Sequence, residues 1–295
     1  MRIAMADKYY SAIRSTKAAA ASSRLGIWPS LLLLLSIVWL TACNVGSQPG
    51  RFADRKLETA VRSALNRPTG KLSPADLQSL TTLDLREKGI RNIGGIEYLS
   101  GLTRLNLYFN KVADLRPLAK LTNLRYLQLS DNRIEDLSPL TNMPVLERLY
   151  LGSNPISDIQ PLGHLTNLSA LGIEFCPVSD LSPLAGSPNL QWLDAVGTHV
   201  KDLSPLASVT TLRRLSLRQN NIADISPLRN LTNLEKVDLS LTSVTDLAPL
   251  VDNPGIGQGD KLILDYLDLS WDAIYVQIPQ LEQRGVTVSH ISLPY

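Results

Sequence analysis

Apolar residues recur along most of the chain with a constant step of 22 residues. Leucine occupies one position in eight successive units: Leu80, Leu102, Leu124, Leu146, Leu168, Leu190, Leu212 and Leu234. An apolar residue, nearly always leucine, follows three positions later in each unit and another follows two positions after that. Self-similarity at this period indicates one small structural unit that stacks on its neighbours to bury a continuous core.

Each unit contains two different patterns. The alternation of apolar and polar residues around the second and third apolar positions predicts a short strand with its apolar side chains facing inward. The second half reads I-x-D-L-x-P-L, as in Ile134–Leu140, and predicts a tight helical turn. The predicted fold is an α/β solenoid that is curved and right-handed. It has a parallel β-sheet on the concave face, 3-10 or short helical turns on the convex face, and a helical cap at each end.

An asparagine follows the predicted strand in four units, as Asn110, Asn132, Asn154 and Asn220. An inward-facing amide at this position can bond to backbone groups that the turning chain leaves unpaired. Cys176 falls in the same column, which predicts a buried structural thiol, whereas Lys88, Thr198 and Thr242 depart from the pattern.

An aspartate column accompanies the convex turns, comprising Asp114, Asp136, Asp158, Asp180, Asp202, Asp224 and Asp246. A ladder of carboxylates is compatible with calcium, but no second column of oxygen ligands runs beside it. Since a proline follows three residues after each aspartate, we expect the carboxylates to cap the convex turns.

The two ends depart from the repeat. Apolar residues at helical spacing predict a helix over about 53–66, and Ser73-Pro74 predicts the start of a second helix, so 52–79 is expected to be the N-terminal cap. After Leu234 the pattern resumes at Leu264, which suggests an eight-residue insertion containing a glycine-rich bulge. The repeats are therefore assigned to 80–261. A ninth, degenerate repeat and a C-terminal cap, with a helix over 272–284 and a strand over 286–288, are assigned to 262–295.

The N-terminal segment differs from the rest of the chain. Residues 1–24 are polar and basic, and 25–42 form an apolar run that ends in Leu40-Thr41-Ala42-Cys43. An uncleaved membrane anchor would have a similar length. The tetrad, however, resembles the lipobox of bacterial lipoproteins. This resemblance implies a signal peptide over 1–42, a lipid on Cys43, a tether over 43–51 and a cell-envelope location. Asn44 after the cysteine favours the outer membrane over the inner one if the source is Gram-negative.

The predicted concave face carries most of the aromatic residues of the repeats. Its candidate ligand-binding residues combine aromatic side chains with arginines, which is the composition of a protein–protein hot spot: Arg104, Tyr108, Phe109, Tyr126, Arg148, Tyr150, Phe175, Trp192, Arg214 and Arg218. The alternative is that some of these rings fold down as cross-strand packing pairs.

Charge and motifs restrict the function further. Without residues 1–42 the chain has 24 Lys and Arg against 26 Asp and Glu, so its weak negative charge gives no reason to expect nucleic-acid binding. The three histidines fall at unrelated positions of the repeat, and neither a zinc-protease nor a serine-hydrolase motif is present. We therefore expect no enzyme activity, no cofactor and no metal.

The 22-residue form with its D-L-S-P-L convex turn resembles the internalin-type, or SDS22-like, class of bacterial leucine-rich repeats. This class is defined by its scaffold, so the resemblance implies the fold. The lipobox and the aromatic, arginine-edged concave face together predict a membrane-anchored module that recognises a protein through its concave face. A glycan of the envelope as ligand, or a structural surface protein without a specific ligand, are the alternatives.

Overall fold

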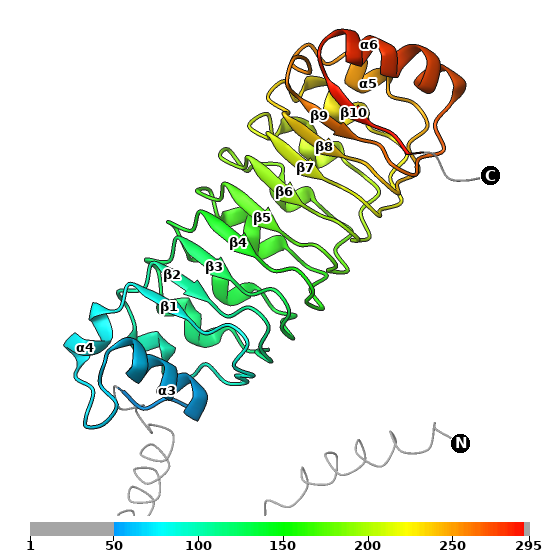
Figure 1. Cartoon of the computed structure of the whole chain (residues 1–295). Coiled ribbons are helices and arrows are strands. Elements are labelled where there is room, and N and C mark those ends of the chain that lie inside the picture. The colour runs from blue at the N-terminus through cyan, green and yellow to red at the C-terminus, as the bar shows by residue number, and fades with distance from the viewer. Residues whose placement is uncertain (1–49, 292–295) are drawn as a thin grey trace, which may run out of the picture. The chain divides into compact units, whose positions relative to one another are not determined.

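The computed structural model describes residues 50–291. The predicted signal segment 1–42 and the lipidation site Cys43 lie outside the described residues. Within 50–291 the chain forms a stack of repeats with strands side by side along one face and short turns along the other (Figure 1).

One parallel sheet runs through the stack, with its ten strands in sequence order. Equivalent leucines pair in register, as Leu105 does with Leu127 and Leu149. The strands are Thr82–Asp84 (β1), Arg104–Asn106 (β2), Tyr126–Gln128 (β3), Arg148–Tyr150 (β4), Ala170–Gly172 (β5), Trp192–Asp194 (β6), Arg214–Ser216 (β7), Lys236–Asp238 (β8), Lys261–Ile263 (β9) and Thr287–Ser289 (β10). The predicted parallel sheet is confirmed.

The convex side consists of short helices, and every one after the first has a proline of the column in its first turn. They are Ile96–Tyr98 (η1), Arg116–Lys120 (η2), Ser138–Leu140 (η3), Gln160–His164 (η4), Ser182–Leu184 (η5), Ser204–Ser208 (η6), Ser226–Asn230 (η7) and Ala248–Val251 (α5). Each of the seven column aspartates accepts a hydrogen bond from the backbone N–H two residues further on, as Asp136 does from Ser138 at 2.8 Å. The capping role is confirmed, although the aspartate lies one residue before the N-cap position.

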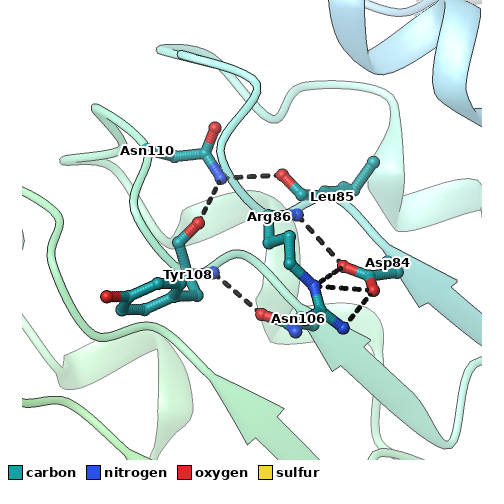
Figure 2. A network of polar contacts seen from close by, with 6 residues as sticks. All are labelled: Asp84, Leu85, Arg86, Asn106, Tyr108 and Asn110. Carbon is teal, nitrogen blue, oxygen red and sulfur yellow. Dashed lines mark hydrogen bonds and ion pairs between the residues drawn. The ribbon is translucent and has the colours of Figure 1, made fainter.

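The asparagine column forms a ladder of buried side-chain bonds. The Nδ2 group of Asn110 donates to the carbonyls of Leu85 and Leu107, both at 2.9 Å, and its Oδ1 accepts from Ile90 N–H at 2.9 Å. Figure 2 shows this amide bridging two consecutive repeats through Leu85 and Tyr108. Each asparagine thus satisfies backbone groups of its own repeat and of the preceding one.

Cys176 replaces an asparagine of the column and is buried, as predicted. Its Sγ donates to the Leu151 carbonyl at 3.3 Å, which corresponds to only one of the bonds that an asparagine makes. Burial raises the pKa of this thiol to about 11, so it is a poor nucleophile.

The N-terminal cap consists of the two predicted helices. The first, α3 (Arg55–Ala64), is capped by Asp54 and buries Leu57 and Val61 against the first repeat. The second, α4 (Pro74–Ser79), begins with a capping box in which Ser73 and Asp76 bond to each other's backbone N–H groups.

At the C-terminal end the predicted register is wrong. Val237 pairs with Leu262, a step of 25, so the insertion has three residues and not eight. Leu264 is therefore equivalent to the third apolar position, and Leu267 occupies the asparagine column. The leucines at 264, 267 and 269 imitate the spacing of a new repeat, which is why counting leucines misplaces it.

The C-terminal cap follows this last full repeat. Its helix begins at Trp271, contains a π-helical turn over Ala273–Gln277 (η8) and continues as α6 (Ile278–Gln283). The chain then turns at Gly285, which has a φ of +86°, into β10, whose Val288 pairs with Leu262. The helix and final strand were both predicted, the strand one residue too early.

Candidate functional site

Three aromatic residues and one arginine pack together on the concave face, and we call Arg104, Tyr126, Tyr150 and Trp192 the concave aromatic cluster. The ring centroids of Tyr126 and Tyr150 are 5.5 Å apart, and those of Tyr150 and Trp192 are 5.6 Å apart. The Arg104 guanidinium lies 3.5 Å from the centre of the Tyr126 ring, which is a cation–π contact. The four side chains come from β2, β3, β4 and β6 and remain partly or largely exposed.

The cluster closes over β5 because that strand carries only small outward residues, Ala170 and Gly172. Strands two apart in a sheet are separated by about 10 Å, so Tyr150 and Trp192 meet only if nothing stands between them. A Cβ atom at Gly172 would lie 3.3 Å from Tyr150 Cδ1 and 3.7 Å from Trp192 Cη2. The small outward residues of β5 therefore leave the space in which the two rings meet.

Two further predicted arginines border this cluster. Arg148 and Arg214 line a depression of about 490 Å³ together with Tyr150 and Trp192. Arg218 lies beyond the end of β7, two residues after Ser216. Its side chain is exposed and does not line this depression.

The remaining predicted aromatics lie at a different place, at the turns that follow the strands. Phe109 and Phe175 both have positive φ, +51° and +55°, and both are more than half exposed. Tyr108 contacts Phe109, with ring centroids 6.0 Å apart. Phe109 lines a separate depression of about 500 Å³ at the edge of the sheet. The aromatic residues that the sequence predicted to form one patch therefore lie on two separate surfaces.

Polar residues at the strand ends serve the backbone. Asn106 Oδ1 accepts from Tyr108 N–H at 3.0 Å, and Asp84 Oδ1 accepts from Arg86 N–H at 3.1 Å (Figure 2). Gln128 and Asp238 make the equivalent bond in their repeats. An Asp or Asn two residues before an N–H that the turn leaves unpaired is a local signal by which this role could have been found in the sequence.

A half-buried carboxyl group beside the cluster was not predicted from the sequence. Glu174 lies against the backbone of Gly152 and Gly172, and its Oε2 has no hydrogen-bond partner among residues 50–291. Burial raises the pKa of Glu174, and the charges of Asp194 and Asp131 raise it further. Burial likewise raises the pKa of Asp194, with a contribution from Asp238.

Replacing Glu174 with glutamine is expected to stabilise the protein at pH 7 but not at pH 4. Because the folded state raises the pKa of Glu174, its stability contribution is complete below about pH 4 and is lost as the pH rises through the raised pKa. Urea unfolding should give a higher midpoint for E174Q than for wild type at pH 7, and equal midpoints at pH 4. E135Q, on the exposed convex side, should change neither; a pH-independent effect of E174Q would show that the charge is not the cause.

The described residues contain neither a metal-binding cluster nor a helix able to span a membrane. Residues 50–291 contain no group of three or more His, Cys, Asp or Glu side chains placed to hold a metal ion. In the same part of the chain, no helix has both the length and the apolar character needed to span a bilayer.

Known leucine-rich-repeat proteins are similar to this chain in sequence and in structure. A model of leucine-rich repeats in two copies matches residues 100–142, 144–186 and 210–251. An internalin (inlF) from Listeria monocytogenes is 31% identical over 84% of this chain and 75% of its own, with a TM-score of 0.75. The chain belongs to the internalin family of leucine-rich-repeat proteins.

Two further structures are similar to this chain, one in both sequence and fold and the other in fold alone. Internalin C2 from the same organism is 35% identical, with 74% of this chain and 94% of that chain covered and a TM-score of 0.67. A Leptospira interrogans leucine-rich-repeat protein shares only the fold, at 21% identity over 73% of this chain and 62% of its own, with a TM-score of 0.62. No curated protein sequence matches the chain. Internalin-family membership therefore establishes the scaffold, a fold typical of protein-recognition modules.

Proposed function

We propose that this internalin-family protein is a membrane-anchored recognition module that binds a protein partner through the concave face of repeats two to six. The concave aromatic cluster carries the proposal. Tyrosine, tryptophan and arginine are the residues enriched in protein–protein hot spots, and here they are gathered on the face that a solenoid holds open. The periphery of the proposed surface consists of Tyr108, Phe109, Phe175 and Arg218.

The structure of the cluster supports contact with a protein in a second way. Tyr150 and Trp192 are held by each other and by the small residues of β5, so they lose little conformational freedom when a partner binds. Arg148 and Arg214 at the border can donate hydrogen bonds to carbonyl or carboxylate groups of the partner.

The test of this proposal is partner capture by the full chain in mild detergent, with Trp192→Ala compared to Trp271→Ala. Trp271 is a matched control because it is 68% exposed and also packs on a tyrosine, Tyr275, but belongs to the C-terminal cap. We expect W192A to weaken capture of a partner protein by at least about 30-fold, the size of a hot-spot substitution, and W271A to leave it unchanged. Loss of glycan binding alone would favour an envelope polysaccharide as the ligand. No effect on either would favour a structural surface protein.

We further propose that the module is anchored in the cell envelope by lipid on Cys43. The tetrad Leu40–Cys43 after an apolar run supports this, and Asn44 favours the outer membrane in a Gram-negative cell. Two or three acyl chains on one residue provide stable membrane attachment, since each buried methylene contributes about 0.8 kcal/mol.

Substitution Cys43→Ser tests the anchor. Radiolabelled palmitate should enter the wild-type protein, and C43S should incorporate none and should leave the membrane fraction. Cys176→Ser is the control, because it removes the buried thiol and should not affect labelling. Equal labelling of wild type and C43S would contradict the proposal.

A further inference from the structure

Three cationic side chains lie next to one another on the concave face beyond the aromatic cluster. Arg214, Lys236 and Lys261 occupy directly paired positions of β7, β8 and β9. All three are exposed, and none has an ion-pair partner within 4.0 Å among residues 50–291. We call them the cation row.

The three positive charges of the cation row lie side by side with no ion pair between them and a neighbouring carboxylate. Like charges at directly opposite positions of adjacent strands repel each other. One position earlier in the repeats the molecule avoids this, because Arg125 pairs with Glu147 and Arg213 with Glu235 across neighbouring strands. Glu235, which precedes Lys236, is bonded to Arg213 and forms no ion pair with the cation row.

The cation row borders a hollow on the concave face. This hollow has a volume of about 810 Å³ and is walled by Trp192 at one end and by Gln258 and Gly259 of the three-residue insertion at the other. Because Trp192 also belongs to the aromatic cluster, the hollow continues the proposed binding surface toward the C-terminal end.

The other side of the hollow is acidic. Asp194 and Asp238 line it two residues further along their strands, and Asp260 lies beside Lys261. A polyanion such as polyphosphate or nucleic acid would be repelled by these carboxylates, whereas a peptide can present separated carboxylates to the cation row alone.

We propose that the cation row binds an acidic segment of the protein partner, with two or three of its carboxylates facing Arg214, Lys236 and Lys261. The proposal rests on the proposed protein-binding function and specifies the chemistry of the partner. It adds Lys236 and Lys261 to the binding surface. Of the three residues of the cation row, only Arg214 was a candidate from the sequence.

The experiment uses the full chain in neutral detergent micelles and a rhodamine-labelled Gly-Glu-Gly-Glu-Gly peptide, with binding followed by fluorescence anisotropy at low salt. The triple variant R214Q/K236Q/K261Q should bind the peptide at least about tenfold more weakly than wild type, since exposed ion pairs contribute up to about 1 kcal/mol each. The control K71Q/K120Q/K201Q removes the same charge from exposed positions elsewhere and should bind as wild type does.

Several outcomes would overturn the proposal. Equal weakening in both triple variants would show that net charge alone is responsible, and equal binding of Gly-Gln-Gly-Gln-Gly would show that the carboxylates are not recognised. Tighter binding of polyphosphate through the same three residues would assign the row to a different class of ligand.

A second measurement does not depend on the peptide. Partner capture that fails in W192A but survives loss of the row would refute this inference and leave the proposed function standing.

Discussion

Replacing Asn132 with alanine is expected to lower the free energy of unfolding by about 3 kcal/mol. The Asn132 amide donates to the carbonyls of Leu107 and Leu129, both at 2.9 Å, and accepts from Val112 N–H at 3.0 Å. All of these groups are buried, so alanine would leave them without partners and without access to water. Urea unfolding followed by circular dichroism measures the loss.

Asn123 provides the control in the adjacent turn. Its side chain is exposed and makes a single bond, to the Ser100 carbonyl at 3.0 Å. We expect Asn123→Ala to lower the free energy of unfolding by less than about 1 kcal/mol. Equal losses in the two variants would contradict the account of the buried asparagine ladder.

The ladder also illustrates what could be predicted from the sequence. The 22-residue period determines which residues face inward, because every strand and turn repeats the same local pattern. The asparagine and aspartate columns could be assigned roles because their bonds run to backbone groups at fixed offsets. The helices of the caps were predictable from Ser73-Pro74 and from the apolar spacing around Leu57.

The candidate surface was less predictable because it depends on neighbours in space. The contact between Tyr150 and Trp192 passes over β5, whose small outward residues leave the space in which the two rings meet. Phe109 and Phe175 were assigned to the same patch, but their positive φ angles turn them to the edge of the sheet. The positive φ recurs at this offset in every repeat from Glu87 to Tyr266, so it is a property of the turn, and the residue types found there do not indicate it.

Glu174 and the C-terminal register show two other limits. A glutamate on an open face is ordinarily solvated, and the burial of Glu174 results from the two glycines beside it. The insertion was misplaced because Leu267, which takes the position of an asparagine, restored an apparent leucine pattern. In both cases the deciding information is tertiary packing.

Replacing Gly255 with alanine is expected to lower the free energy of unfolding by about 2–3 kcal/mol. A Cβ atom there would lie 2.0 Å from the Thr232 carbonyl oxygen and 2.5 Å from the Thr232 Cα, so the insertion would have to move away from the preceding turn. The displaced loop contains Gln258 and Gly259, which wall the hollow beside the cation row. Chemical unfolding measures the stability, and peptide anisotropy should show weaker binding.

Gly186→Ala is the matched control for this substitution. A Cβ atom at Gly186 would meet no atom within 4 Å, and its backbone does not have a positive φ. We expect a change of no more than about 0.5 kcal/mol. If G255A were as stable as G186A, the insertion would not be packed against Thr232 as described.

The central claim is that the concave aromatic cluster contacts a protein. Site-specific photo-crosslinking in living cells tests it most directly, with a benzophenone amino acid in place of Trp192 or, as a control, in place of Tyr275 on the C-terminal cap. The account predicts a protease-sensitive crosslinked protein from position 192 and none from position 275. A crosslink to protein at 275 alone, or the absence of any crosslinked protein at 192, would contradict it.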